Sequence, residues 1–459
     1  MRITHPSAPS FDPMAPQKRS KKAPTLLFPP EPAYVTLMSH TSPVSLQEIV
    51  QTRCKSLYTK YRPTWWLPNG HFQTLHSALG DFSAIDQVWY ERRLCRHLLR
   101  LVDGGTLGLD FTPPDRDAAY IPDDAPIIVV QHGLTGGSHE PYVRAVLSPL
   151  TAPVERGGLG FRAVVVNFRG CSGVPMTSTR FYTAMQTDDL RQALTYISSR
   201  FPKAPMLGLG FSVGGNVLVR YLAEEGLNTR LGAAAILGNP WDLVTNTLGL
   251  HESAMGRYVY LRGMGANIRR LLLHHQKTFM HNPQHPVAIA VQKVLGLENP
   301  TLTDFDDIVT RTVGEKPPFP FKSVNEYYAY ASSHEIAADV RVPCLTINAA
   351  DDPVVQRVQM AAKDAQKSGY LITAITESGG HLAWFSGRKG RKRWTTKPVM
   401  EWLQVFGREV VREPPPVVIS ADEDGFLREP QWPNLGCREV GISIVNGNRP
   451  KNAVLIQGL

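Results

Sequence analysis

Cysteine is scarce in this chain, and the few cysteines form no pattern typical of a disulfide framework or a metal site. The sequence has five cysteines, none of them in a CxxC pair or beside histidines at zinc-ligand spacing. We therefore expect no disulfide framework and no metal ion, and a reducing compartment fits this usage. Long apolar runs are missing too. No run approaches the roughly 18 uninterrupted apolar residues of a membrane span, so no transmembrane helix is expected.

The N-terminus lacks the apolar core of a secretory signal. Residues 1–30 are basic and rich in proline, which predicts a cytoplasmic location. A mitochondrial address is the alternative, because the stretch has some transit-peptide character, although its prolines argue against an amphipathic helix. We expect residues 1–40 to be a disordered tail and residues 412–459, which begin near a run of prolines, to be an extended C-terminal tail.

Acidic residues are outnumbered by basic ones. The chain has 49 Lys and Arg against 40 Asp and Glu, a formal net charge of +9, and the basic residues are densest at 17–22 and 387–397. Aromatic residues do not alternate with these cations as they do on a single-strand binding face, so no nucleic-acid partner is expected. A solvated basic surface, peripheral contact with an anionic membrane or lipid droplet, and a site for the phosphates of acyl-CoA are the alternatives.

Between the tails, short apolar runs alternate with turns and longer helical stretches. Continuous apolar runs without alternation are typical of strands buried on both faces, so the pattern predicts an α/β fold with a mostly parallel sheet flanked by helices. We expect one domain over 41–411, interrupted by a helical cap at about 241–335, where no strand pattern occurs. The runs predicted to be strands are 126–133, 161–170, 205–212, 231–240, 343–353 and 370–381.

The pentapeptide GFSVG, residues 210–214, places Ser212 where an apolar run gives way to a helical pattern. A GxSxG motif alone is a weak signal, but the strand–turn–helix context is that of a nucleophile elbow, in which flanking glycines let the chain turn sharply and expose the serine. The alternative is a glycine-rich turn with an incidental serine.

A serine hydroxyl needs a base and an orienting acid, and both occur in the expected chain order. His381 comes directly after a predicted strand, at the end of the run 370–381, and Gly379 and Gly380 precede it, so it is the predicted base. Asp352 is the predicted acid because it follows a strand and precedes a proline, and Asp351 is the alternative. We therefore predict a catalytic triad of Ser212, Asp352 and His381 that performs acyl transfer without a cofactor.

A glycine-rich loop after the run 126–133 completes the predicted site. Acyl transfer develops an oxyanion that needs preorganised donors, and the backbone amides of Leu134 and Val213 are the natural pair. Tyr142 either packs near this loop or is an ordinary aromatic residue of the next helix.

The chain resembles one branch of the α/β-hydrolases, the AB hydrolase 4 family that includes bacterial YheT hydrolases, plant EMB8-like proteins and animal ABHD-type lipases. The resemblance implies an α/β-hydrolase fold, the same triad and an ester or lipid hydrolase. Fungal members are similar to medium-chain fatty acid ethyl ester synthase/esterases, which transfer an acyl group from coenzyme A to an alcohol. The matching stretches are WWLPNGHFQTL (65–75), HGLTGGSHEPYVR (132–144), residues 164–190, GFSVGGNVLVRYL (210–222), FDDIVTR (305–311), NAADDPVV (348–355) and ESGGHLAWF (377–385).

Three functions from two classes stay under consideration. The first is a serine esterase or lipase acting on medium-chain acyl or glycerolipid esters, and the second is an alcohol O-acyltransferase using acyl-CoA and the same triad. The third is an inactive lipid-binding or scaffold protein, against which the complete set of motifs argues. The HxxxxD spacing of His76 and Asp81, sometimes linked to acyltransferases, is expected to be structural.

Overall fold

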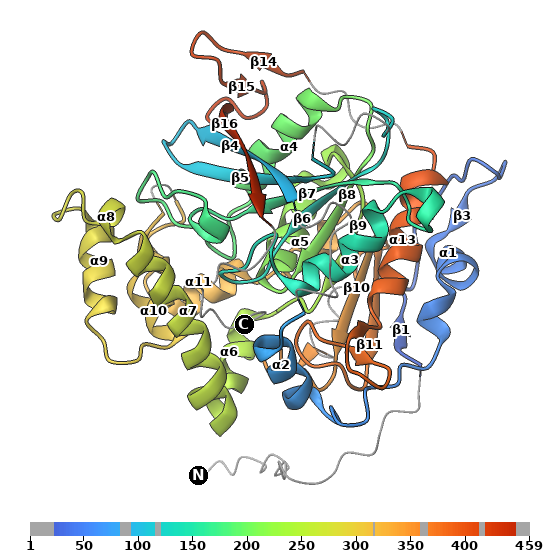
Figure 1. Ribbon diagram of the computed structural model, residues 1–459, viewed down its shortest axis with the longest axis horizontal. Coiled ribbons are helices and arrows are strands. Elements are labelled where there is room, and N and C mark those ends of the chain that lie inside the picture. Colours follow the sequence, from blue (N-terminus) through green and yellow to red (C-terminus); the bar gives the residue numbers. More distant parts are fainter. Residues whose placement is uncertain are drawn as a thin grey trace, which may run out of the picture.

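The protein is built on one large sheet with helices on both faces (Figure 1). The computed structural model describes residues 23–82, 93–114, 121–314, 317–358, 366–412 and 418–446. The sheet has twelve strands in the order β1-β11-β10-β9-β8-β6-β7-β5-β4-β16-β15-β14. Its parallel part runs from β11 to β7. This is an α/β-hydrolase architecture, and the predicted fold class is confirmed.

The parallel strands form because their side chains are apolar on both faces of the sheet, and helices cover both faces. β6, for example, consists of IIVVQ and is buried throughout. Each apolar run predicted to be a strand contains one of them. Their bounds are β6 Ile127–Gln131, β7 Arg162–Asn167, β8 Met206–Phe211, β9 Leu231–Leu237, β10 Cys344–Ala349 and β11 Leu371–Thr376.

Antiparallel strands extend the sheet at both ends. β1 pairs with β11, and at the other end β5, β4, β16, β15 and β14 follow one another. Two small sheets lie apart from the large one. The bounds are β1 Thr25–Leu27, β4 Arg93–Leu101, β5 Thr106–Thr112, β14 Ser420–Ala421, β15 Leu427–Arg428 and β16 Cys437–Asn446, with β2 Tyr34–Val35 on β3 Val44–Ser45 and β12 Phe385–Ser386 on β13 Lys392–Arg393.

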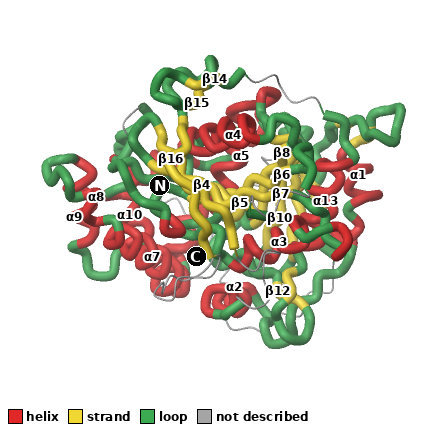
Figure 2. Tube along the Cα trace, turned by 45° about the horizontal axis from the view of Figure 1, so that its top comes forward, coloured by secondary structure: helices red, strands yellow, loops and turns green. Residues whose placement is uncertain are grey.

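Helices cover the two faces and form the cap. One core lies between the sheet and α1, α3 and α13, and a second between the sheet and α4 and α5. Figure 2 shows the strands between these helices. The helices are α1 Leu46–Arg53, α2 Gly70–Leu79, α3 Pro141–Thr151, α4 Asp188–Arg200, α5 Val213–Glu225, α6 Leu243–Glu252, η6 Gly256–Tyr260, α7 Leu261–His274, α8 Gln276–Phe279, α9 Pro286–Leu295, α10 Leu302–Ile308, α11 Val324–Ala331 and α13 Thr396–Arg408. Short 3₁₀ turns are η1 Lys55–Tyr58, η3 Val154–Arg156, η4 Cys171–Gly173, η5 Gly226–Asn228, η7 Thr310–Thr312 and η8 Ala337–Asp339.

The cap lies between β9 and β10, at the carboxyl edge of the parallel strands. Helices α6 to α11 fill this insertion, and its described residues include no strand. Because ligands of open α/β sheets bind outside the carboxyl ends of the strands, the cap covers the side where the functional site belongs.

Both segments that were expected to be tails contain strands of the large sheet among their described residues. Residues 1–22 lie outside the described residues, but β1 adds a strand beside β11. At the C-terminus, β16 pairs with β4 along nine residue pairs, from Cys437 with Leu101 to Asn446 with Arg93. The segment 437–446 is thus a strand of the sheet rather than a free tail, because β4 offers an open edge with unpaired backbone groups.

Two further observations bear on the composition. All five cysteines are buried and free of disulfides. Among the residues whose structure is described, no helix is both long enough and apolar enough to cross a bilayer.

Candidate active site

Ser212 lies at a sharp turn between β8 and α5. Its backbone has φ 52° and ψ −125°, a region that a side chain other than glycine rarely adopts and that costs on the order of 1–3 kcal/mol. The neighbouring glycines leave room for this turn. A Cβ on Gly214 would lie 2.3 Å from the His132 carbonyl oxygen, and one on Gly210 would lie 2.7 Å from the Cα of Gly215. The local sequence therefore forms a nucleophile elbow, as predicted from its glycines.

The structure brings together the three side chains predicted from the sequence. His381 Nε2 lies 3.0 Å from Ser212 Oγ, and His381 Nδ1 lies 2.8 Å from Asp352 Oδ2. The histidine and the aspartate are 2% and 4% exposed, whereas the serine is half-buried. A buried carboxylate on Nδ1 holds the imidazole with Nε2 toward the hydroxyl, which is the geometry for removing the serine proton.

Asp352 and its neighbour Asp351 have different partners. Oδ1 of Asp352 accepts hydrogen bonds from the amides of Val354 and Val355, at 2.8 and 2.9 Å, so that only Oδ2 faces His381. Asp351 accepts from the Gly380 amide at 3.0 Å, and burial raises its pKa to about 6. The alternative acid therefore contacts the backbone of the histidine loop rather than the imidazole.

Helix α2 fixes the position of the histidine loop, a role that the sequence did not reveal. The Thr74 hydroxyl accepts a hydrogen bond from the His381 amide at 2.8 Å. Gln73 Oε1 accepts from the Phe385 amide at 2.9 Å, on the far side of the same loop. Asn69 caps the helix by accepting from the Phe72 amide. The stretch WWLPNGHFQTL, which carried part of the family resemblance, was the available signal.

Leu134 and Val213, whose backbone amides are the predicted oxyanion donors, line the cavity beside Ser212. Within the described part of the chain, neither amide donates to a protein acceptor. The amides on either side of Leu134 are held, since Gly133 donates to the Tyr142 hydroxyl at 2.9 Å and Thr135 donates to that of Tyr182 at 3.0 Å. These two hydrogen bonds hold the loop in place, and the Leu134 amide between them keeps its hydrogen available. That arrangement suits an oxyanion donor.

Tyr142 packs beneath this loop and also against the elbow. Its ring lies 4.9 Å from that of Phe211, the residue before the nucleophile, and burial raises the pKa of its phenol so that it stays neutral. His132, close by, is excluded as a base. Burial lowers the pKa of its imidazole to about 4, and its Nε2 accepts a hydrogen bond from the Phe168 amide.

His76 packs in an aromatic cluster and contacts no member of the triad. Its ring lies 4.8 Å from that of Phe385 and 4.9 Å from that of Trp66, and its Nε2 lies 3.1 Å from the Gly390 carbonyl oxygen. The HxxxxD spacing is therefore explained by packing.

A largely apolar cavity of about 780 Å³, mouth included, opens beside Ser212. The cap supplies most of its apolar wall, and the loops after β6, β7 and β10 also contribute to it. The apolar residues that matter most are Leu250, Met264, Ile268, Leu302 and Phe305 from the cap and Phe181 from the loop.

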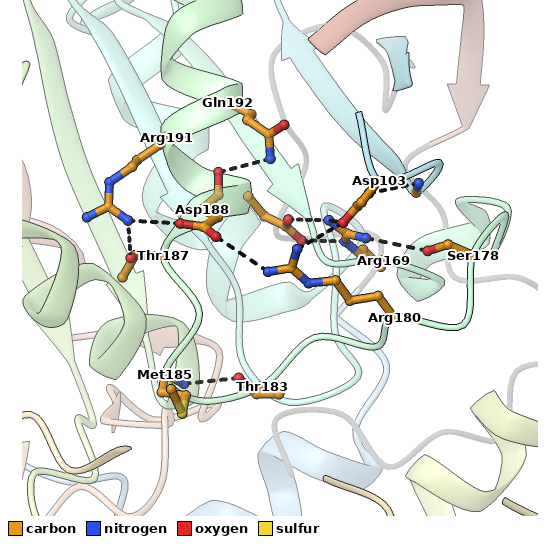
Figure 3. A network of polar contacts seen from close by, with 12 residues as sticks. Asp103, Arg169, Ser178, Arg180, Thr183, Met185, Thr187, Asp188, Arg191 and Gln192 are labelled. Atoms are coloured by element: carbon orange, nitrogen blue, oxygen red, sulfur yellow. Dashed lines mark hydrogen bonds and ion pairs between the residues drawn. The ribbon is translucent and has the colours of Figure 1, made fainter. Parts of the chain in front are cut away.

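Ion pairs hold the loop that carries Phe181 (Figure 3). Arg169 contacts Asp103 at 2.8 Å and Asp189 at 2.7 Å, and Arg180 contacts Asp103 at 3.0 Å. The network ties the segment between β7 and α4 to the turn between β4 and β5. Because these side chains are largely buried, the network fixes this wall of the cavity more firmly than surface pairs would.

One carboxyl lines the cavity on the cap side. Asp306, from the stretch FDDIVTR, accepts hydrogen bonds from the Thr310 hydroxyl at 2.6 Å and the Tyr328 hydroxyl at 2.7 Å, and burial raises its pKa to about 6. The folded state therefore holds the proton of Asp306 more tightly than the unfolded state does. This favourable contribution is fully present below about pH 4 and is lost as the pH rises through about 6.

We expect Asp306→Asn to stabilise the protein at pH 8 and to have little effect near pH 4. The amide keeps one acceptor and one donor for the two hydroxyls and removes the buried charge, so the free energy of unfolding should rise by about 3 kcal/mol at pH 8. Thermal melting of both proteins at the two pH values measures the effect. Asp307→Asn is the matched control, because Asp307 is exposed and pairs only with Arg311 in the described structure. An equal gain at both pH values would contradict this account.

Comparison with known proteins assigns the family. Residues 126–388, more than half of the chain, match the family model described as alpha/beta hydrolase fold. The chain belongs to the α/β-hydrolase fold family. The matched range begins at β6 and includes all three residues of the predicted triad.

Several curated relatives of this hydrolase are named as lipases or esterases. It is 29% identical over 405 residues to a monoacylglycerol lipase of Saccharomyces cerevisiae, covering 80% of this chain and 86% of the relative. It is 32% identical over 404 residues to medium-chain fatty acid ethyl ester synthase/esterase 2 of the same yeast, covering 75% and 86%. It is also 27% identical over 349 residues to human phospholipase ABHD3, covering 75% and 78%. The predicted resemblance and the predicted enzyme class, a serine ester hydrolase, are confirmed.

Proposed function

We propose that this α/β-hydrolase cleaves medium-chain fatty acyl or glycerolipid esters through an acyl intermediate on Ser212. The observation that carries the proposal is the hydrogen-bonded chain from Asp352 through His381 to Ser212, which ends at a largely apolar cavity. The names of the yeast lipase and the human phospholipase support acyl esters of glycerol as substrates.

The geometry suggests how each step proceeds. His381 Nε2 takes the proton of Ser212 as Oγ attacks the acyl carbonyl carbon, and the carbonyl oxygen becomes an oxyanion that accepts from the amides of Leu134 and Val213. The tetrahedral intermediate collapses, the C–O bond to the alcohol breaks, and His381 returns the proton to the departing alcohol. Water then repeats the attack on the acyl-serine and releases the fatty acid. Each step is completed by protein groups and water.

A second function follows if an alcohol replaces water in the last step. The product is then an ester, and acyl-CoA serves as donor with its thiol as the leaving group. The yeast ethyl ester synthase/esterase at 32% identity supports this candidate. The same triad serves both reactions, so the acceptor that reaches the acyl-serine decides between them.

A product assay tests the two candidates. The purified protein is incubated with esters of increasing acyl length and with monoacylglycerols, and parallel tubes contain acyl-CoA and ethanol. We expect acid release that is greatest for medium-chain esters, because the cavity is enclosed by cap residues. Ethyl ester as the main product would assign the transferase. A folded protein that forms neither product would contradict both and favour the binding-protein alternative.

A further inference from the structure

The outward side of α2 is apolar, although it faces solvent. Phe72 and Leu79 are 55% and 74% exposed, and Leu75, half-buried, lies between them on the same side of the helix. Trp65, 62% exposed, precedes the helix in the same segment. A polar outer face is usual for a surface helix, so this stripe marks an interaction surface.

A strongly basic hairpin lies against this apolar stripe. β12 and β13 form the hairpin, and residues 387–391 form its tip. The Trp66 indole donates to the Arg388 carbonyl oxygen at 3.2 Å, and His76 of α2 contacts Gly390. No acidic residue occurs from 385 to 397. Four cations of the hairpin are exposed: Arg388, Lys389, Arg391 and Lys392.

The first cap helices, α6 and α7, lie next to α2 on the same side of the molecule. His71 of α2 stacks on Tyr260 and forms a 2.7 Å hydrogen bond with its hydroxyl. Near this junction Tyr258 is 61% exposed, and the guanidinium groups of Arg257 and Arg262 lie over its ring. Figure 1 shows α2, α6 and α7 side by side, and Figure 2 shows β12 on the other side of α2.

The inner side of α2 contacts the catalytic machinery. Thr74 holds the His381 amide, and Ala78 belongs to one apolar cluster with Leu250 and Met264, which line the cavity. Helix α2 therefore contacts the active site with its inner side and presents the apolar stripe to solvent on its outer side.

We propose that α2, the preceding Trp65 and Trp66, and the basic hairpin form an interfacial docking face for an anionic phospholipid bilayer. Indole and phenyl rings partition into the boundary between headgroups and acyl chains, and Lys and Arg are attracted to anionic lipids. The face combines both, with four exposed cations beside five exposed or half-buried large apolar side chains. Docking there brings the active-site helix to the membrane surface, which is the source of glycerolipid esters. The inference goes beyond the proposed function, because binding does not require ester cleavage.

Vesicle sedimentation tests the docking face. The full-length protein is mixed with vesicles of phosphatidylcholine alone and with vesicles that also contain phosphatidylserine, at low and high salt. We expect binding to the anionic vesicles, weakened by salt. The double variant Lys389→Glu/Lys392→Glu should lower the partition coefficient about tenfold or more. Trp65→Ala/Phe72→Ala should lower it on the same vesicles by a comparable factor.

A matched control separates this face from a general effect of net charge. Lys203→Glu/Lys293→Glu changes the net charge equally on exposed lysines that lie before β8 and on α9. This control should bind as the wild type does, and all variants should keep the wild-type melting temperature and hydrolyse a short water-soluble ester equally well.

Several results would overturn the docking face. They are absence of wild-type binding to anionic vesicles, equal loss in the control variant, unchanged binding in both face variants, and retention on single-stranded RNA without vesicle binding. Failure of the proposed function shows separately, as absence of hydrolysis of the short ester by the wild type.

Discussion

Ser212→Ala should abolish ester cleavage while leaving the fold intact. Loss of the nucleophile in a serine triad lowers kcat roughly 10⁶-fold, and only the catalysis from the oxyanion donors and from binding is left. The substitution removes one hydroxyl, keeps the strained backbone of the elbow and disturbs no packed apolar group. The measurement is the initial rate on a medium-chain ester, with product identified as acid or ethyl ester.

Two controls make that result specific. The melting temperature should match that of the wild type, because the hydroxyl contacts only the imidazole in the described structure. Ser138→Ala is a second serine-to-alanine control, and it should keep its activity because Ser138 lies outside the triad. The Ser138 hydroxyl, in the loop after β6, donates to the Asp110 carboxylate. Activity in Ser212→Ala near the wild-type rate would exclude the nucleophile and favour the binding-protein alternative.

Asp352→Asn should lower kcat roughly 10⁴-fold, the effect of placing the imidazole in the wrong tautomer. The structure explains why the amide cannot escape this result by rotating. The amides of Val354 and Val355 require an acceptor at Oδ1, so the new NH₂ group must face His381 Nδ1. The ring then carries its proton on Nε2 and cannot accept the proton of Ser212.

Asp351→Asn is the companion variant that decides between the two acids. Because Asp351 contacts the Gly380 amide and not the imidazole, an amide at this position keeps the acceptor, and kcat should stay within about tenfold of the wild type. Kinetics of both variants at pH 7 provide the test. The reverse order of effects would assign Asp351 as the orienting acid.

The parallel half of the sheet and the elbow were predictable because their signals are local. Runs such as IIVVQ in β6 and RAVVVN in β7 are apolar at every position that must be buried, so each strand can be recognised from its own residues. The turn at Ser212 needs glycines at 210 and 214 for steric reasons that act within a few residues. The candidate triad then follows from chain order and from its positions after β8, β10 and β11.

The strand β16 could not be predicted in this way. Its partner β4 lies more than 330 residues earlier in the chain, and its sequence, CREVGISIVN, has mixed polarity because it lies near the edge of the sheet. Nothing local separates such a strand from an extended tail, since the backbone conformation is the same and only the distant partner differs.

The sequence by itself determined the fold class, the elbow, and the serine and histidine proposed for catalysis, and it narrowed the acid to two neighbouring aspartates, because strand burial, glycine geometry and chain order act over short distances. The tertiary structure alone decided which carboxylate meets His381, which surface of α2 holds the histidine loop and which side remains exposed and apolar. Those answers depend on contacts between segments hundreds of residues apart, such as Thr74 with His381 and Trp66 with Arg388. Such contacts arise only when the whole sheet and its cap have packed.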